Sequence, residues 1–356
     1  MVSNRVVDAD GHVIEPEDIW DNFLPPAYRR LAPRRVRDSE GHVRFLLGDE
    51  LQPFLPSLNR ANTEHIDRPG GSDPVARLQD MDSEGMDVAI CFTSAGLYFG
   101  GVDDPQLNNA LCRAYNDWLH DYSRTDPDRI VGVAMVPQPD IGLAMAETER
   151  ATKDLGFKAV MWRPNPIAGR NVDHPALEPF FSLLEELDIP LALHEGTTQN
   201  IPQAGRDRFD NYLYRHMVSH PHEMQMACMT LICGGVLERH PLLKVVFLES
   251  GAGWIAHWLD RMDNHVKHWG YASRKLELKP TEYYNRQCFI SADPDEPIIP
   301  GLIQVIGDDT IVFASDYPHS DSTFPGVVAE LADRTDLSKE SKAKILGENA
   351  VRLYGL

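Results

Sequence analysis

The stretch Arg5-Val6-Val7-Asp8-Ala9-Asp10-Gly11-His12 decides how the rest of the chain is interpreted. Its β-branched start predicts a strand. Side chains alternate between the two faces of a strand, so Asp8, Asp10 and His12 are expected on one face. Gly11 has no Cβ and lets the backbone approach whatever these side chains hold. Two carboxylates and an imidazole that converge suit a divalent metal, although a solvated acidic strand end would contain the same residues.

Composition narrows the class of protein. The 356 residues are 42% hydrophobic and 25% charged, which is enough for one large core, and we expect a single domain over residues 1–356. A net charge of -20 repels phosphate backbones, so nucleic acid is an unexpected partner. The sequence contains no run of eighteen apolar residues, so we expect no membrane span. The first strand begins too early for a signal peptide, and the five cysteines are dispersed, so we expect a cytoplasmic protein.

Short apolar runs alternate with helical patterns along most of the chain. Strands are expected from residue 5 and at 87–92, 130–135, 158–162, 190–194, 244–249, 288–291 and 310–314. Helices are expected at 74–85, 105–125, 141–155, 175–187, 221–240, 253–268 and 296–306, and from 325 onward. Eight such units predict a closed (β/α)8 TIM barrel. The competing fold, an open doubly wound sheet, would need a glycine-rich phosphate turn after the first strand, and Asp-Gly-His is not one.

A long insertion follows the first strand, from Glu15 to Asp73. It is rich in proline, and its pattern predicts two short helical pieces and a hairpin around residues 43–47. Aromatic residues such as Trp20 and Phe45 indicate that it packs on something. We therefore expect residues 15–73 to form a lid over the mouth of the barrel at the carboxyl ends of the strands.

Ionisable residues stand at almost every predicted strand end, although the strands themselves are apolar. They are Asp8, Asp10, His12, Arg163, His194, Glu195, Glu249, Asp293, Asp316 and His319. In a (β/α)8 barrel these ends meet at one mouth, where active sites lie. A single buried histidine is often structural. Asp10, His12, His194 and Asp316 together predict a four-ligand metal site drawn from three strands.

Several motifs resemble the amidohydrolase superfamily, in the branch of amino-carboxymuconate-semialdehyde decarboxylase and its relatives. They are Asp10-Gly11-His12, Ile189-Pro190-Leu191-Ala192-Leu193-His194, residues 234–241 with 244–247, Phe313-Ala314-Ser315-Asp316-Tyr317-Pro318-His319, and residues 349–354. The resemblance covers nearly the whole chain. It implies a metal-dependent barrel enzyme whose ligands are the four residues named above. One departure is Glu249, since branch decarboxylases typically place a histidine there.

The resemblance and the strand-end residues together lead to a hydrolase as the main expectation. One divalent ion, zinc first and manganese or iron next, would activate water against a bond beside a carbonyl of a small organic acid or aromatic compound. Asp316 would be both ligand and general base, and Glu249 would orient water or carry a proton, unless it is a structural partner of an arginine or a helix.

The remaining expectations concern substrate and alternatives. Arg163 would clamp a substrate oxygen, or else pair with an acid across the mouth. His220 and Arg60 would line the pocket. The first alternative activity is non-oxidative decarboxylation of an aromatic or dienoic acid. The second is a metal-stabilised binding protein without turnover, which pocket-facing acids argue against because they cost stability if unused. The expected partners are a small molecule and a second copy of the chain, as a dimer.

Overall fold

Eight parallel strands form one sheet in the computed structural model, which describes residues 5–52, 59, 68–197, 201–272, 274–320 and 322–356. Their order is the order of the chain. The strands are β1 (Val7–His12), β5 (Val88–Phe92), β6 (Ile130–Ala134), β7 (Ala159–Trp162), β8 (Leu191–Leu193), β9 (Val245–Phe247), β10 (Cys288–Ala292) and β11 (Ile311–Phe313). Every residue in them is buried, as in sheets covered on both faces.

The sheet closes between its first strand and the segment that follows its last. The backbone N–H of Asp316 donates to the carbonyl of Asp10 at 2.9 Å, and that of His12 donates to the carbonyl of Tyr317 at 2.6 Å. The side chain of Asp8 also accepts from the backbone N–H of Ser315 at 2.9 Å. The predicted (β/α)8 barrel is therefore confirmed.

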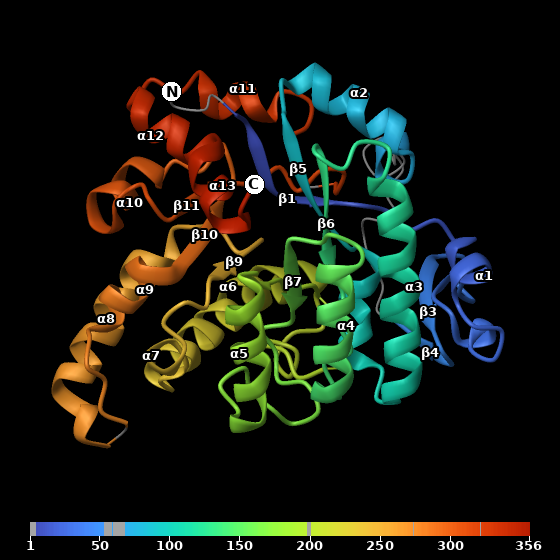
Figure 1. Ribbon diagram of the computed structural model, residues 1–356, viewed down its shortest axis with the longest axis horizontal. Coiled ribbons are helices and arrows are strands. Elements are labelled where there is room, and N and C mark those ends of the chain that lie inside the picture. The colour runs from blue at the N-terminus through green and yellow to red at the C-terminus, as the bar shows by residue number, and fades with distance from the viewer. Residues whose placement is uncertain (1–4, 53–58, 60–67, 198–200, 273, 321) are drawn as a thin grey trace.

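Helices surround the barrel and follow the strands in order, so the colours of Figure 1 run around the molecule. The longer ones are α2 (Pro74–Glu84), α3 (Pro105–Ser123), α4 (Ile141–Lys153), α5 (Glu178–Leu187), α6 (Tyr212–Cys233), α8 (Trp254–Trp269), α9 (Pro280–Gln287) and α10 (Ile299–Ile306). Four shorter helices also lie around the barrel: α7 (Val236–Arg239), α11 (Val327–Ala332), α12 (Lys339–Ala343) and α13 (Asn349–Tyr354). Asp73, Asp104 and Asp140 cap α2, α3 and α4 through side-chain oxygens.

One predicted helix boundary is wrong in a way that matters for the site. The helix expected to start at Pro221 begins instead at Tyr212, where the Asn211 side chain caps it. Pro221 therefore lies inside α6 rather than at its first turn. Proline is frequent at helix starts, which misled the prediction, although a long helix with a good cap tolerates an internal one at some cost. As a result His220 sits in the middle of a helix.

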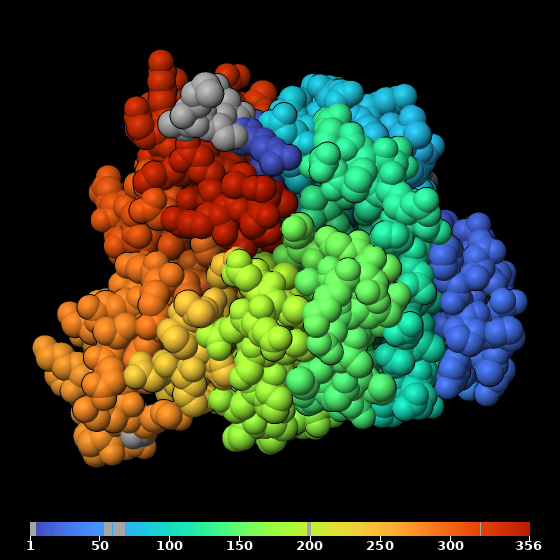
Figure 2. Space-filling model, viewed as in Figure 1, coloured from blue at the N-terminus to red at the C-terminus, as the bar shows by residue number. Residues whose placement is uncertain are grey.

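The described part of the insertion forms a small unit against the barrel. It contains α1 (Ile19–Phe23) and an antiparallel sheet of β2 (Arg34–Arg37), β3 (Val43–Leu47) and β4 (Glu50–Leu51). Phe45 stacks on Tyr98 with ring centroids 5.4 Å apart, and Trp20 meets Phe99 at 6.0 Å. Both partners lie in the 3₁₀ helix Ala95–Gly101, just past the carboxyl end of β5. The unit forms the blue lobe at the edge of Figure 2.

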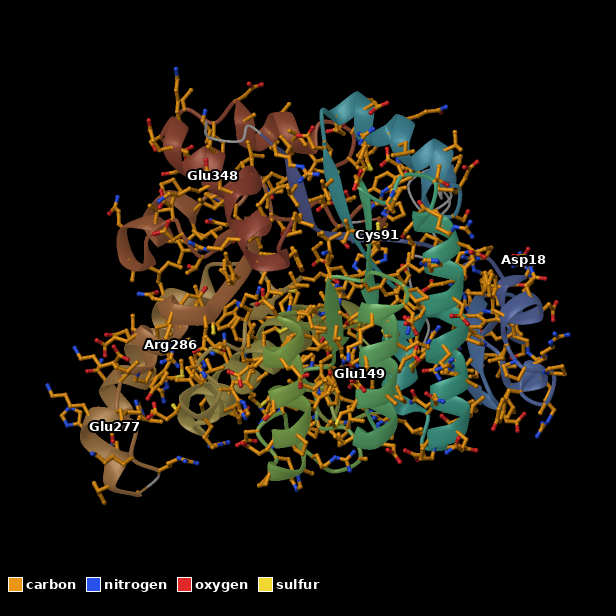
Figure 3. The ribbon with its side chains drawn as sticks, viewed as in Figure 1. Asp18, Cys91, Glu149, Glu277, Arg286 and Glu348 are labelled. Carbon is orange, nitrogen blue, oxygen red and sulfur yellow. The ribbon has the colours of Figure 1, made fainter. Side chains whose placement is uncertain are left out.

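The core is continuous from the strands to the helices. Cys91 on β5 is fully buried in the middle of the molecule, whereas Asp18 and Glu277 lie at the periphery (Figure 3). The five cysteines are all unpaired. Within the described residues, none of the helices combines the length and apolar character that crossing a bilayer requires.

Candidate metal centre

Two histidines at strand ends face each other across the barrel mouth. The Nδ1 of His12 lies 2.8 Å from the carbonyl oxygen of Thr93, and the Nδ1 of His194 lies 2.7 Å from that of Glu195. Because a carbonyl only accepts, each Nδ1 carries a hydrogen, and each Nε2 is left to accept. The two Nε2 atoms are 3.0 Å apart. Only a shared proton or a cation relieves that contact.

Two carboxylates complete this arrangement. Asp10 Oδ1 lies 3.4 Å from His194 Nε2 and 3.7 Å from His12 Nε2. Asp316 Oδ1 lies 3.5 Å from His12 Nε2. Asp10 is 1% exposed, and its Oδ1 has no hydrogen-bond partner among the described residues. A buried acceptor without a donor costs free energy, so the donor set of Asp10, His12, His194 and Asp316 fits a divalent cation. Their role as ligands stays a prediction.

Asp8 does not join this group, contrary to the expectation that it shares a face with Asp10 and His12. The pairing of β1 with β5 shifts register between Asp8 and Gly11, so the alternation of side chains is interrupted there. Asp8 accepts the hydroxyl of Ser315 at 2.5 Å and its backbone N–H at 2.9 Å. Its carboxylate thus helps to join β1 to β11.

Glu249 points into the cluster from the end of β9. Its Oε2 lies 3.3 Å from His194 Nε2, and its Oε1 lies 3.4 Å from His220 Nε2. Burial opposes ionisation of this carboxyl, but the hydrogen bond with His220 dominates and holds its pKa well below the ordinary value. Glu249 and Asp316 both have left-handed backbones, with φ of 45° and 52°. Such strain in residues other than glycine is typical of functional positions.

His220 reaches the site from α6. Its Nδ1 lies 3.2 Å from the Ser219 hydroxyl and 3.3 Å from the carbonyl of His216, which leaves Nε2 for Glu249. Burial lowers the pKa of His220, but the hydrogen bond to Glu249 and its charge raise it to about 9. A protonated imidazole beside an ionised carboxylate can move a proton. His222, by contrast, is exposed and turned to the carbonyl of Val218.

The guanidinium of Arg163 is buried and donates hydrogen bonds to groups of the protein itself. Its NH2 donates to Glu195 Oε1 at 3.2 Å and to the carbonyl of Gly196 at 2.7 Å, and its Nε donates to Asn165 Oδ1 at 3.1 Å. The side chain is 1% exposed. The ion pair with an acid at the mouth is thus the arrangement observed, and a clamp on substrate stays a prediction. Arg60 lies outside the described residues.

His319 belongs to the cluster, although no role was predicted for it from the motif that contains it. Its ring stacks on His12 at 4.0 Å, and its Nδ1 lies 2.8 Å from Asp316 Oδ1. Its Nε2 contacts the Ser94 hydroxyl at 2.8 Å. Its position, three residues after the predicted ligand Asp316 at the same strand end, could have indicated that His319 lies in the site. His319 therefore orients Asp316 and covers one side of His12.

Comparison with known proteins identifies the family. The family model described as "Amidohydrolase" matches residues 7–356. The chain belongs to the amidohydrolase family. A 2-amino-3-carboxymuconate-6-semialdehyde decarboxylase of Dictyostelium discoideum is 26% identical over 291 residues, which is 80% of this chain and 77% of that protein.

Two solved structures of family members share the fold. An amidohydrolase from Mycobacterium avium subsp. paratuberculosis superposes with a TM-score of 0.83 at 22% identity, covering 100% of both chains. A dihydroxybenzoic acid decarboxylase from Polaromonas sp. JS666, solved with bound manganese and the inhibitor 2-nitroresorcinol, gives 0.71 at 21% identity, covering 99% of this chain and 97% of the other. The amidohydrolase-family chain is therefore an enzyme, a hydrolase or a carboxy-lyase. The relatives favour the decarboxylase alternative over the hydrolase that the sequence put first.

Proposed function

We propose that this amidohydrolase-family protein is a metal-dependent, non-oxidative decarboxylase of an aromatic or dienoic acid. The observation that carries the proposal is the Glu249–His220 pair, 3.4 Å apart beside the four predicted ligands. Loss of carbon dioxide leaves a carbanion-like carbon that must receive a proton. The histidine that branch decarboxylases place at the end of this strand is replaced by Glu249, but α6 brings the Nε2 of His220 within 3.4 Å of that glutamate. Names of decarboxylases among the relatives support the same reading.

The four predicted ligands would hold one divalent ion. When bound, it would polarise the substrate carboxylate and a neighbouring oxygen. Zinc stays our first expectation because two imidazoles and two carboxylates suit it. Manganese is equally compatible with two oxygen donors and is the metal of the Polaromonas structure. Elemental analysis of the purified protein, with activity restored to the apoprotein by each metal, decides between them.

The protein's own groups supply the proton. His220 in its imidazolium form donates through Nε2, and Glu249 between it and the cluster passes the proton to the carbon that has lost its carboxyl group. Asp316, held in place by His319 at 2.8 Å, takes the proton of a substrate hydroxyl while the carboxyl group leaves and returns it to the product, and His220 regains its proton from solvent. The products are carbon dioxide and the protonated, shortened acid or phenol, so atoms and charge balance without an added oxidant.

The test is to follow the origin of atoms in the product. Candidate hydroxybenzoates and dienoic acids are incubated with metal-loaded enzyme in D₂O and, separately, in H₂¹⁸O. Decarboxylation releases carbon dioxide and places one solvent deuterium on the carbon that lost the carboxyl group. Incorporation of ¹⁸O into the organic product without release of carbon dioxide would overturn the proposal.

That second outcome is also what the competing function predicts. Glu249 in place of a histidine favours a carboxylate that activates water, which supports hydrolysis of a bond beside a carbonyl. The two activities therefore separate in one experiment. We also expect a dimer, and light scattering after gel filtration of the same preparation measures its mass.

A further inference from the structure

A second group of possible ligands adjoins the candidate metal centre. One nitrogen each from His216 and His220 and one carboxylate oxygen of Glu249 lie within 4.8 Å of one another. His216 and His220 are four residues apart on α6, and their rings stack at 4.2 Å. Histidines at this spacing lie on the same face of a helix and commonly bind one metal together. Two imidazoles and one carboxylate are a complete protein ligand set for zinc.

Glu249 belongs to both groups. It also falls among the possible ligands formed by His12, Asp316 and His319. Its Oε2 faces His194 at 3.3 Å and its Oε1 faces His220 at 3.4 Å, so the two oxygens are directed to opposite sides. A carboxylate in this position can bind one cation through each oxygen. Two-metal sites in enzymes hold their ions about 3.5–4 Å apart, a separation that a shared carboxylate allows.

The far side of His220 is already arranged as it is around metal-bound histidines. Its Nδ1 faces three acceptors, at 3.2 Å from the Ser219 hydroxyl, 3.3 Å from the His216 carbonyl and 3.8 Å from Glu195 Oε2. Glu195 is fully buried, and this Oε2 has no hydrogen-bond partner among the described residues. Metal-binding histidines typically donate their second ring N–H to a backbone carbonyl or a carboxylate, and the His216 carbonyl at 3.3 Å is the acceptor here. The Nε2 of His220 is thereby directed at Glu249.

We propose that His216, His220 and Glu249 form a second, weaker divalent-metal site, separated from the first by the Glu249 carboxylate. Only its inhibitory effect rests on the proposed function. A cation bound there takes the place of the proton that His220 and Glu249 exchange. The enzyme with one metal is then active, and the enzyme with two is inhibited. Because the second site has one charged ligand and the first has two, zinc fills the first site at lower concentration.

The test compares the wild-type protein with His216→Phe, which keeps a flat ring against His220 but has no nitrogen to bind metal. Apoprotein is dialysed against increasing free Zn²⁺, and bound zinc is measured by mass spectrometry. The wild type should bind two equivalents in separate steps, and His216→Phe should bind one with unchanged affinity. Exposed His222→Phe on the same helix is the matched control and should keep two. A wild type that saturates at one equivalent, or a His216→Phe that retains the second, overturns the proposal.

A second measurement addresses the effect on turnover. With the first site filled, excess zinc should lower wild-type turnover by roughly 10²-fold, the usual contribution of a proton-transfer group. His216→Phe should keep its basal activity and resist the excess metal. Zinc stoichiometry needs no substrate, so a failed decarboxylase assignment leaves it intact. Equal inhibition of both proteins would overturn the inhibitory role while the count of bound ions still tests the site.

Discussion

The two sides of β1 contain buried aspartates in opposite situations. On the side towards α2, Asp8 accepts three hydrogen bonds, two from Ser315 and one from the N–H of Asp10 at 3.3 Å. On the side towards the barrel mouth, Asp10 Oδ1 faces two histidine nitrogens and has no hydrogen-bond partner among the described residues. A satisfied buried carboxylate stabilises the fold, whereas an unsatisfied one reduces stability unless a ligand binds it.

The basic groups near the two aspartates also differ: Asp8 lies near a permanently charged arginine, and Asp10 lies near titratable histidines. Arg77 on α2 is 1% exposed, donates to the carbonyl of His12 at 2.8 Å and lies over the ring of Tyr317 at 4.5 Å. Burial raises the pKa of Asp8 to about 6, and the charge of Arg77 limits that rise. Around Asp10 the nearest partners are imidazoles. The comparison teaches that a buried acid beside a permanent cation is structural, and one beside titratable bases is a ligand candidate.

The largest loss of activity should follow from removing one of the predicted metal ligands at the barrel mouth. His194→Ala removes an Nε2 from the four predicted ligands. Metal content should fall with activity, and turnover should drop by roughly 10³-fold or more, since a metal supplies several kcal/mol of transition-state stabilisation. Metal analysis of the purified variant, with His222→Ala as the exposed control, checks this. Full occupancy with normal binding strength would remove His194 from the ligand set.

Glu249→Gln should separate proton transfer from metal binding. The amide keeps the size of the side chain but cannot accept a proton, so we expect the fold and the ion at the first site to persist while turnover falls by roughly 10²–10⁴-fold. Circular dichroism and elemental analysis establish that only the chemistry changes. Near-normal turnover would show that Glu249 has a structural role and would leave Asp316 as the only base.

Arg77→Met should damage the other side of the strand. The change removes the buried guanidinium whose charge favours the ionised form of Asp8, and it takes away the donor to the His12 carbonyl. Leaving a buried polar group without its partner costs about 1–3 kcal/mol. Urea unfolding should show this loss, while the activity of the remaining folded enzyme changes far less than in His194→Ala. Exposed Arg124→Met, whose ion pair with Asp121 is on the surface, should shift stability by less than about 0.5 kcal/mol. If Arg77→Met kept its stability but lost its metal, the Asp8 side of β1 would serve metal binding rather than stability, contrary to the comparison.

The smallest effect concerns the insertion. Phe45→Ala removes the stacking on Tyr98 that joins β3 to the segment after β5. An aromatic pair contributes about 0.5–1.5 kcal/mol. If the insertion forms part of the pocket wall, as we predict, KM should rise a few-fold with kcat and metal content nearly unchanged. An unchanged KM would separate the insertion from the substrate pocket.

The sequence predicted the barrel well because its evidence was local. Apolar runs covered on both faces and helices that begin with Asp-Pro are visible in the chain itself. The strand ends then brought Asp10, His12, His194 and Asp316 together, since parallel strands end at one mouth. Because Glu249 also stands at a strand end, its place beside His194 could be predicted for the same reason.

What the sequence missed depended on irregularities. The register shift in β1 separated Asp8 from Asp10, and no motif marked it. Pro221 suggested a helix start, so the position of His216 one turn before His220 went unnoticed. For Arg163 the sequence left a substrate clamp and an ion pair both open, and the structure shows the pair with Glu195.

The closure of the barrel through Asp10 and Asp316 also bears on how the protein is made. Asp10 and His12 on the first strand of the barrel are synthesised before His194, whereas Asp316 comes after the last strand. Chains fold progressively from their amino end as they emerge. Until β11 is made, a nascent chain therefore carries three of the four predicted ligands without the backbone bonds that hold the first strand to the segment after the last. Stable capture of the ion accordingly has to wait for synthesis of the last strand of the barrel.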